Sequence, residues 1–432
     1  MNRDRDSHDQ RRGSGASRGG KDENPSPSDG VTSIDTAERA VMTPQAWERL
    51  CDVMRDAGRF VYADGVPSSP ADRAEGLRYL TRLIASGINV CMELGDGEAP
   101  RFGRMIDCTM KWGLDAPDCL YLYSSVCGDA VYRIHGRLGT ANHVDVQVNY
   151  GHYAAGDISQ WGTVSSLNSR DLATGPDGEV EILLGGKPRD RNWLALAPNA
   201  EFVLVRQYFG DWNHEQPADL YIERLDGLDV PEPVPTPDAI AARLERLAGW
   251  IERGGSLWES MSRGFLDLEP NSLIFHDTNA SDAHGGMQGQ AYGLGNFRCA
   301  PDEAVIVEFA VPDCPHWSVS LADWYWQSFD YATRQSSLNC RQAVVDNDGV
   351  FRAVIAHRDP GVANWLDAAG HEQGTIAIRF LLADRAAPPT LRRVALEQVA
   401  QALPASTARV TEQERVRTIA ERRAAVLRRF RR

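Results

Sequence analysis

Near residue 119 the hydrophobicity of the sequence changes to a period of two residues. Apolar and polar residues alternate in short runs, and no long helical pattern separates one run from the next. Because successive side chains of a strand point to opposite faces, such runs predict β-strands in an antiparallel sandwich or barrel. The expected strands cover 120–126, 131–137, 143–150, 180–184, 202–209 and 220–225.

A second β-rich section follows a proline-rich stretch at 231–237, which predicts a stiff linker. Thr-Pro and Ser-Pro pairs at 43–44, 69–70 and 236–237 predict helix starts. The fold class is therefore mainly β with helical additions. We expect a disordered tail over 1–35, a helical segment over 36–118, a first sandwich section over 119–230, a linker and helical connector over 231–299, a second sandwich section over 300–385 and C-terminal helices over 386–432.

Composition excludes several classes of partner and chemistry. The chain carries 46 basic and 60 acidic residues, a net charge of −14, which disfavours attraction to nucleic acid or anionic lipid. No apolar run approaches the roughly 20 residues that span a bilayer, and no secretory signal opens the chain, so we expect a cytoplasmic protein. The eight cysteines form no CxxC pair, and no dinucleotide-binding, P-loop, nucleophile-elbow or zincin motif occurs. We expect no cofactor and a small-molecule ligand.

The segment 357–372 predicts a site loop between two strand-like runs. His357 ends an apolar row, and Asp359-Pro360-Gly361 has the composition of a tight turn in which Gly takes a positive φ. His357 is either a structural histidine or a functional one. The loop also carries acid, base and guanidinium groups that could act together. The candidate catalytic residues are His357, Asp359 and His371, and the loop's candidate ligand-binding residues are Arg358, Asn364 and Trp365.

Arg206 and Tyr208 share a strand face that is otherwise apolar, which predicts an inward-facing arginine. A buried guanidinium needs an acidic partner or a bound anion. It could therefore form a structural ion pair, or it could recognise a ligand carboxylate, phosphate or sulfate. Trp212, on the following turn, could stack on an apolar ligand or a sugar ring. The candidate partners of the arginine are Asp211, Glu215 and Asp219.

The stretch 131–149 predicts a hairpin with one polar face, formed by a row at Arg133, His135 and Arg137 and a second row that begins at His143. That face is either solvated or the wall of a ligand cavity. His143 and Asp145, with the distant His214, also have the order of a two-histidine, one-carboxylate iron site. A non-haem iron oxygenase is therefore an alternative function.

Two motifs, Trp324-Tyr325-Trp326 and the segment 357–370, resemble a bacterial family known as domain of unknown function twelve-fourteen, most clearly over 300–383. The resemblance implies a jelly-roll-like sandwich and transfers no catalytic residue. The leading interpretation is a metal-independent acid–base enzyme or binder acting on a small apolar or glycosidic metabolite. The remaining alternative is a non-catalytic binding or scaffolding protein.

Overall fold

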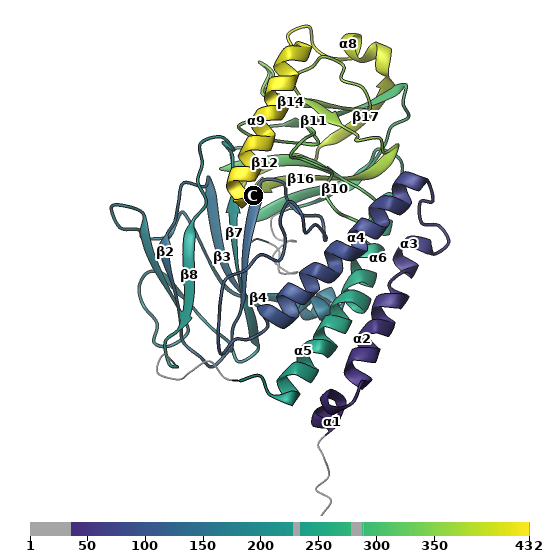
Figure 1. Ribbon diagram of the computed structural model, residues 1–432. Helices are drawn as coiled ribbons and strands as arrows, with labels where there is room; N and C mark the ends of the chain where they lie inside the picture. Colours follow the sequence, from purple (N-terminus) through teal and green to yellow (C-terminus); the bar gives the residue numbers. More distant parts are fainter. Residues whose placement is uncertain (1–35, 228–233, 278–286, 288, 432) are drawn as a thin grey trace, which may run out of the picture.

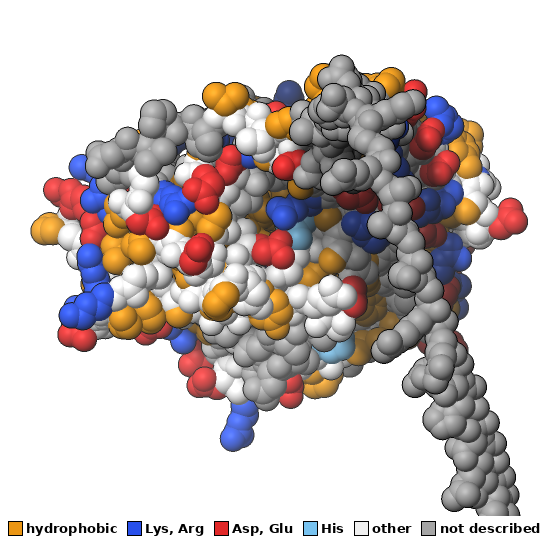
Figure 2. All heavy atoms as spheres, turned by 90° about the horizontal axis from the view of Figure 1, so that it is seen from below, with side chains coloured by type: hydrophobic (Ala, Val, Ile, Leu, Met, Phe, Trp, Pro, Cys, Tyr) orange, Lys and Arg blue, Asp and Glu red, His pale blue; other side chains and the backbone are white. Residues whose placement is uncertain are grey.

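The structure, a computed structural model, describes residues 36–227, 234–277, 287 and 289–431 (Figure 1). The tail expected over 1–35 lies outside these residues. Among those described, no helix combines the length and apolar character needed to cross a membrane. Where the described residues are visible in Figure 2, acidic, basic and apolar side chains are interspersed.

A helical layer covers one side of the molecule, with α4, α5, α6 and α2 lying side by side (Figure 1). Ser69 caps α4 by accepting a hydrogen bond from the Asp72 amide, and Thr236 caps α5 in the same way, as their Ser-Pro and Thr-Pro pairs predict. At the first such pair, however, Thr43 donates to the Arg39 carbonyl instead. The helices are α1 Thr36–Met42, α2 Gln45–Asp56, α3 Arg59–Tyr62, α4 Pro70–Ile88, α5 Pro237–Gly249 and α6 Gly255–Leu266.

Two four-stranded sheets form the first sandwich around a core that includes Val146, Val205, Ile134 and Ile182. One sheet has the order β1 (Cys119–Ser125), β7 (Ala200–Tyr208), β3 (His143–Tyr150), β4 (Gly162–Asn168). The other has the order β6 (Trp193–Leu194), β5 (Glu179–Leu184), β2 (Tyr132–Arg137), β8 (Asp219–Arg224).

The prediction of a hairpin over 131–149 is wrong, because β2 and β3 belong to opposite sheets. The strand β2 pairs with β5 and β8, whereas β3 pairs with β4 and β7. Residues 138–142 therefore cross from one sheet to the other. Both faces of β3 are buried as a result. The valines of β3 lie in the sandwich core, and its polar side chains lie on the opposite face of the sheet, toward the rest of the molecule.

The second sandwich packs two sheets around a core that includes Val307, Phe351, Ile378 and Phe380. One sheet has the order β13 (Ser337–Asn339), β12 (His316–Ala322), β16 (Gln373–Leu381), β10 (Gln290–Arg298), β9 (Leu273–His276). The other has the order β15 (Trp365–Asp367), β14 (Val350–Ala356), β11 (Glu303–Ala310), β17 (Thr390–Ala395). Strands β9, β10 and β17 extend this unit beyond the expected 300–385 on both sides.

The C-terminal helix α9 (Glu412–Phe430) runs along the second sandwich toward the first (Figure 1). It follows the short α8 (Val399–Ala402), and Thr411 with Glu414 forms the capping box that starts it. Arg415 and Arg422 are buried on its inner face, and so is Arg429. On the same helix, Val416 is 65% exposed.

Candidate functional site

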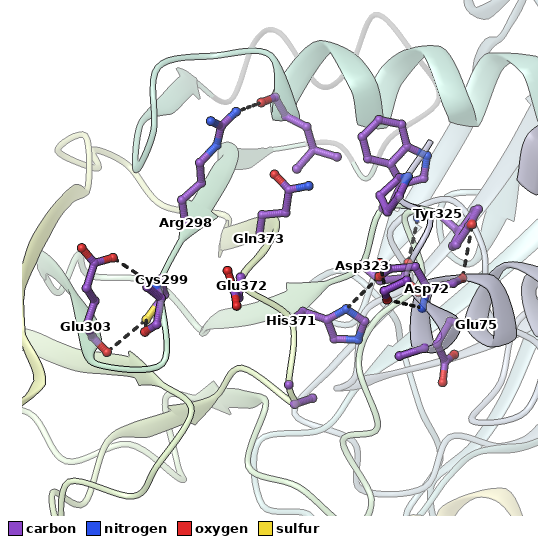
Figure 3. A pocket seen from close by; sticks show the side chains of 18 residues that line it. Asp72, Glu75, Arg298, Cys299, Glu303, Asp323, Tyr325, His371, Glu372 and Gln373 are labelled. Carbon is purple, nitrogen blue, oxygen red and sulfur yellow. Dashed lines mark hydrogen bonds and ion pairs between the residues drawn. The ribbon is translucent and has the colours of Figure 1, made fainter. Parts of the chain in front are cut away.

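A pocket of about 760 Å³ lies between the start of α4 and the second sandwich. Figure 3 shows His371, Asp72, Asp323 and Glu75 together at one end, with Cys299 and the residues around it at the other. The polar and aromatic lining comprises Ser69, Asp72, Glu75, Arg298, Cys299, Glu303, Asp323, Trp324, Tyr325, His371, Glu372 and Gln373.

His371 enters the pocket from the loop between β15 and β16. The loop turns through positive φ angles at Ala369 and Gly370, and the His371 amide donates to the Ala368 carbonyl over 2.9 Å. The imidazole stacks on Phe329 with ring centroids 4.6 Å apart. Burial lowers the pKa of His371, although Asp72 opposes this shift. The imidazole is consequently neutral near pH 7 and able to accept a proton.

Asp72 faces His371 from the first turn of α4. The distance from His371 Nδ1 to Asp72 Oδ1 is 3.9 Å (Figure 3). Ser69 holds this carboxylate in place, because its hydroxyl donates to Asp72 Oδ2 over 2.7 Å while accepting from the Asp72 amide. The cap that starts the helix therefore also aims an acidic group at the histidine.

Asp323 lies on the same side of the pocket, directly after β12. Its Oδ1 accepts from the amides of Tyr325 and Gln327 over 2.9 and 3.2 Å, and its Oδ2 accepts from Gln327 Nε2 over 2.7 Å. Burial raises the pKa of Asp323 to about 7; the Gln327 hydrogen bonds oppose this rise and Glu75 adds to it. Near neutral pH this carboxyl can hold a proton.

The electrostatic character of the pocket is acidic. Its carboxyl groups outnumber its one guanidinium, that of Arg298, which donates to the Leu266 carbonyl over 3.2 Å. Half-buried Trp324 adds an aromatic wall. Carboxylates that accept hydrogen bonds beside an aromatic face suit a ligand with several hydroxyl groups. The acidic lining residues are Asp72, Glu75, Glu303, Asp323 and Glu372.

Comparison with known proteins places the chain in a family. The model of a family described as a protein of unknown function (DUF1214) matches residues 149–210 and 303–385. The crystal structure of an uncharacterized protein from Burkholderia cenocepacia is 33% identical, with a TM-score of 0.79 over 84% of this chain and 99% of that chain. The chain belongs to the DUF1214 family. His371 and Asp323 lie in the second matched segment, whereas Asp72 lies outside both.

A second solved structure, the VPA0106 protein from Vibrio parahaemolyticus, is 13% identical to the DUF1214 chain. The alignment covers 80% of this chain and 100% of that chain, with a TM-score of 0.43. No curated protein matches the chain.

Of the three candidate catalytic residues, only His371 lines the pocket of this DUF1214 protein. His357 does not line the pocket, and its Nε2 lies 2.8 Å from the carbonyl oxygen of Cys299, which does. Asp359 faces α9, where Oδ2 accepts from Arg415 Nε over 2.9 Å and Oδ1 accepts from the Gly361 amide. His357 and Asp359 therefore have structural partners outside the site.

The other candidates from the same loop lie away from the pocket. Arg358 is exposed. The Asn364 amide donates to the carbonyls of Val344 and Arg352 over 2.6 and 2.8 Å, and Trp365 Nε1 donates to the Ala356 carbonyl over 3.0 Å. Asn364 and Trp365 thus fix β15 against its neighbours.

Arg206 of the DUF1214 chain is buried in the interior of the protein. Its Nη1 lies 3.3 Å from Asp145 Oδ2 and also contacts Gln147. The arginine thus has an acidic partner, but one on the neighbouring strand rather than Asp211, Glu215 or Asp219. The hydroxyl of Tyr208 donates to Gln290 over 3.4 Å.

Trp212 is buried as well, and its Nε1 donates to Asp118 Oδ1 over 2.8 Å. Arg422 and Arg429 from α9 lie over its ring at 4.5 and 4.4 Å. With Arg206 and Tyr208, it lies outside the pocket lining.

The residues of the iron alternative do not converge. Asp145 pairs with Arg206, whereas His214 is 84% exposed and lies 2.8 Å from Asp211. His143 is buried and contacts the Ser169 hydroxyl. Within the described ranges, no group of three or more His, Cys, Asp or Glu side chains could hold a metal ion.

The two polar rows of 131–149 have different environments. Arg133 and His135 lie on the outer face of their sheet, where both contact Glu223, and Arg137 contacts Glu179 there. The row that begins at His143 is buried. The solvated interpretation thus describes β2 and does not describe β3.

Sequence reasoning missed Asp72, Glu75 and Asp323. Asp72 carries a visible signal as the third residue of a capped helix, but that signal indicates a helix start only. Asp323 directly precedes the Trp-Tyr-Trp motif at 324–326. Neither position indicates proximity to His371, because the contacts join segments far apart in the chain.

Proposed function

We propose that the protein is a metal-independent acid–base enzyme that acts on a small glycosidic metabolite bound between α4 and the second sandwich. The observation that carries the proposal is the convergence of His371, Asp72 and Asp323 on one pocket.

His371 is the general base. Its lowered pKa leaves the imidazole neutral at neutral pH, which is the form that accepts a proton. Asp72 faces Nδ1, so Nε2 is the nitrogen that takes a proton from a ligand hydroxyl or a water molecule. Asp72 then stabilises the imidazolium that forms.

Asp323 is the general acid. Its pKa of about 7 keeps a substantial protonated fraction near neutrality, so it can donate to a glycosidic oxygen as the bond to the leaving group weakens. Its backbone and Gln327 contacts fix its orientation. One group that loses a proton and one that accepts it thus lie in the same pocket.

The lining favours the glycosidic ligand over the apolar one. Carboxylates at several positions accept hydrogen bonds from sugar hydroxyls, and Trp324 offers a face for a sugar ring. An apolar ligand would desolvate these carboxylates without compensation, which is costly.

The test is hydrolysis of a panel of nitrophenyl glycosides by wild-type protein in the presence of EDTA. We expect turnover that His371→Asn reduces by about 100-fold, the lower end of the usual contribution of a general base. The matched control is His214→Asn, because His214 is exposed on a loop away from the pocket.

Equal turnover in wild type and His371→Asn would overturn the assignment of the base. Loss of wild-type turnover in EDTA would overturn metal independence. If the glycosides perturb the His371 resonances without being cleaved, the protein is a binder and the enzymatic part of the proposal fails.

A further inference from the structure

A second cavity of about 320 Å³ adjoins the first. The two cavities share Glu75, Asp323, Ala369 and His371, so the proposed base stands at their common boundary. The smaller cavity differs in charge, because four basic side chains line it against three acidic ones. The basic residues are Arg78, Arg82, Lys111 and Arg334, and the acidic residues are Glu75, Asp323 and Asp330.

Two of the four cations already have acidic partners. Arg334 Nη1 lies 2.8 Å from Asp367, and Arg78 Nη1 lies 3.7 Å from Glu75. Arg82 and Lys111 remain, and no carboxylate of the described residues forms an ion pair with either. Burial lowers the pKa of Arg82 and of Lys111, and a neighbouring guanidinium adds to each shift, whereas nearby carboxylates, Asp115 foremost, oppose both.

Lys111 is only 3% exposed. Its Nζ donates to the carbonyls of Ser328 and Phe329 over 3.0 and 2.8 Å and lies 4.2 Å from the centre of the Tyr331 ring. An ammonium has three donors, so these two hydrogen bonds leave one for the cavity that the residue lines. The carboxylates of Asp115 and Asp330 act on this ammonium from nearby. Four basic side chains nevertheless face three acidic ones across the cavity, and this excess of basic groups favours a bound oxyanion.

Arg82 projects from α4 into the same cavity. Its Nη1 donates to Gln327 Oε1 over 2.5 Å, and Gln327 in turn donates to Asp323. This chain of contacts fixes the orientation of the guanidinium. Its other N–H groups are available for a planar or tetrahedral oxyanion.

We propose that the smaller cavity binds an oxyanion group of the ligand, a carboxylate or a phosphate, through Arg82 and Lys111. The inference rests on the proposed function, which places the sugar part of the same ligand in the larger cavity. His371 then stands between the anionic group and the sugar ring. The substrate class is accordingly an acidic sugar rather than a neutral one.

The test compares three probes that share a sugar ring: glucose, glucuronate and glucose 6-phosphate. Dissociation constants are measured from the His371 ring resonances of wild-type protein. At least one charged sugar should bind about tenfold or more tightly than glucose, because charge-assisted hydrogen bonds are stronger than neutral ones. The tighter of the two charged sugars identifies the oxyanion as carboxylate or phosphate.

Arg82→Gln should remove most of this advantage and leave glucose binding unchanged, whereas the exposed Arg423→Gln should alter neither. Lys111→Met should have the same effect, and Arg82→Gln provides the result if burial of Lys111 prevents that variant from folding. If glucose binds as tightly as both charged sugars, or if Arg82→Gln weakens all three equally, the oxyanion site is overturned. If none of the sugars shifts His371, the proposed function itself fails.

Discussion

His371 and Asp72 meet across the boundary between the helical layer and the second sandwich, with Nδ1 3.9 Å from Oδ1. The histidine belongs to a sandwich loop and the aspartate to the first turn of α4. Docking of the helical layer therefore completes the site, and either element alone would present half of it.

Asp72→Asn should lower the pKa of His371 further. The Asp72 carboxylate favours the protonated imidazole, so its loss leaves burial to act with less opposition. The Ser69 cap persists in this variant because the Asp72 amide still donates to the Ser69 hydroxyl. Titration of the His371 ring by NMR measures the shift, and Asp177→Asn in an exposed turn is the control. An unchanged or raised pKa would contradict the pairing.

Stability should fall as pH rises through about 9, because of His316. Burial would lower the pKa of His316, but Asp118 and Cys340 outweigh it and raise the pKa to about 9. A folded-state pKa above the unfolded value of about 6.5 contributes stability that is present below pH 6.5 and lost above pH 9. The loss is a few kcal/mol, at about 1.4 kcal/mol per pKa unit.

Urea unfolding at pH 6 and at pH 10 measures this loss. His316→Gln should flatten the difference between the two pH values. The same slope in wild type and variant would show that other groups cause it.

Arg422→Ala should reduce the free energy of unfolding by roughly 2–4 kcal/mol. The guanidinium donates to the Tyr331 carbonyl, to Gln342 and to the Ser337 hydroxyl, and its removal leaves the Tyr331 and Ser337 acceptors buried without this donor. The matched control is Arg423→Ala, which removes an exposed guanidinium from the same helix. Chemical denaturation compares the two. Equal effects would indicate that the inner face of α9 contributes no specific contacts.

Gly361→Val should destabilise the protein by roughly 1–3 kcal/mol through backbone strain. Gly361 has a φ of 70°, and the nearest atom to an added Cβ would be the Val410 carbonyl oxygen at 3.8 Å, so conformation rather than space opposes a side chain. Gly361→Asn should cost less, because Asn tolerates a positive φ. If the melting temperatures of the two variants coincide, the left-handed conformation is not the cause.

The strands could be predicted from the sequence because alternation is local. The run at 143–150 became β3 within the same bounds, and the positive φ of Gly361 follows from the Asp-Pro-Gly turn. Strand pairing could not be predicted in the same way. The short connection after β2 is compatible with a hairpin, yet it crosses from one sheet of the sandwich to the other. The strands that pair with β3 are β4 and β7, which come later in the chain, so the local sequence does not reveal them.

The site was only partly predictable for a similar reason. The composition of the 357–372 loop pointed to His371, but also to His357 and Asp359, whose partners Cys299 and Arg415 come from distant segments. Arginine side chains are mostly exposed in proteins, so the three arginines at seven-residue spacing on α9 would by themselves indicate a solvated helix face. Their burial depends on carbonyls and aromatic rings that only the tertiary structure supplies.

The ligand site between α4 and the second sandwich is tested by the response of the His371 ring to sugars in protein labelled with ¹³C at histidine, with His371→Asn used to assign the resonance. We predict that a glycosidic probe shifts the His371 signals in a saturable way, changes the pKa of the His371 ring, and leaves the His214 signals unchanged. If the sugars shift other histidines and leave His371 unmoved at saturation, the pocket between α4 and the second sandwich is not the ligand site.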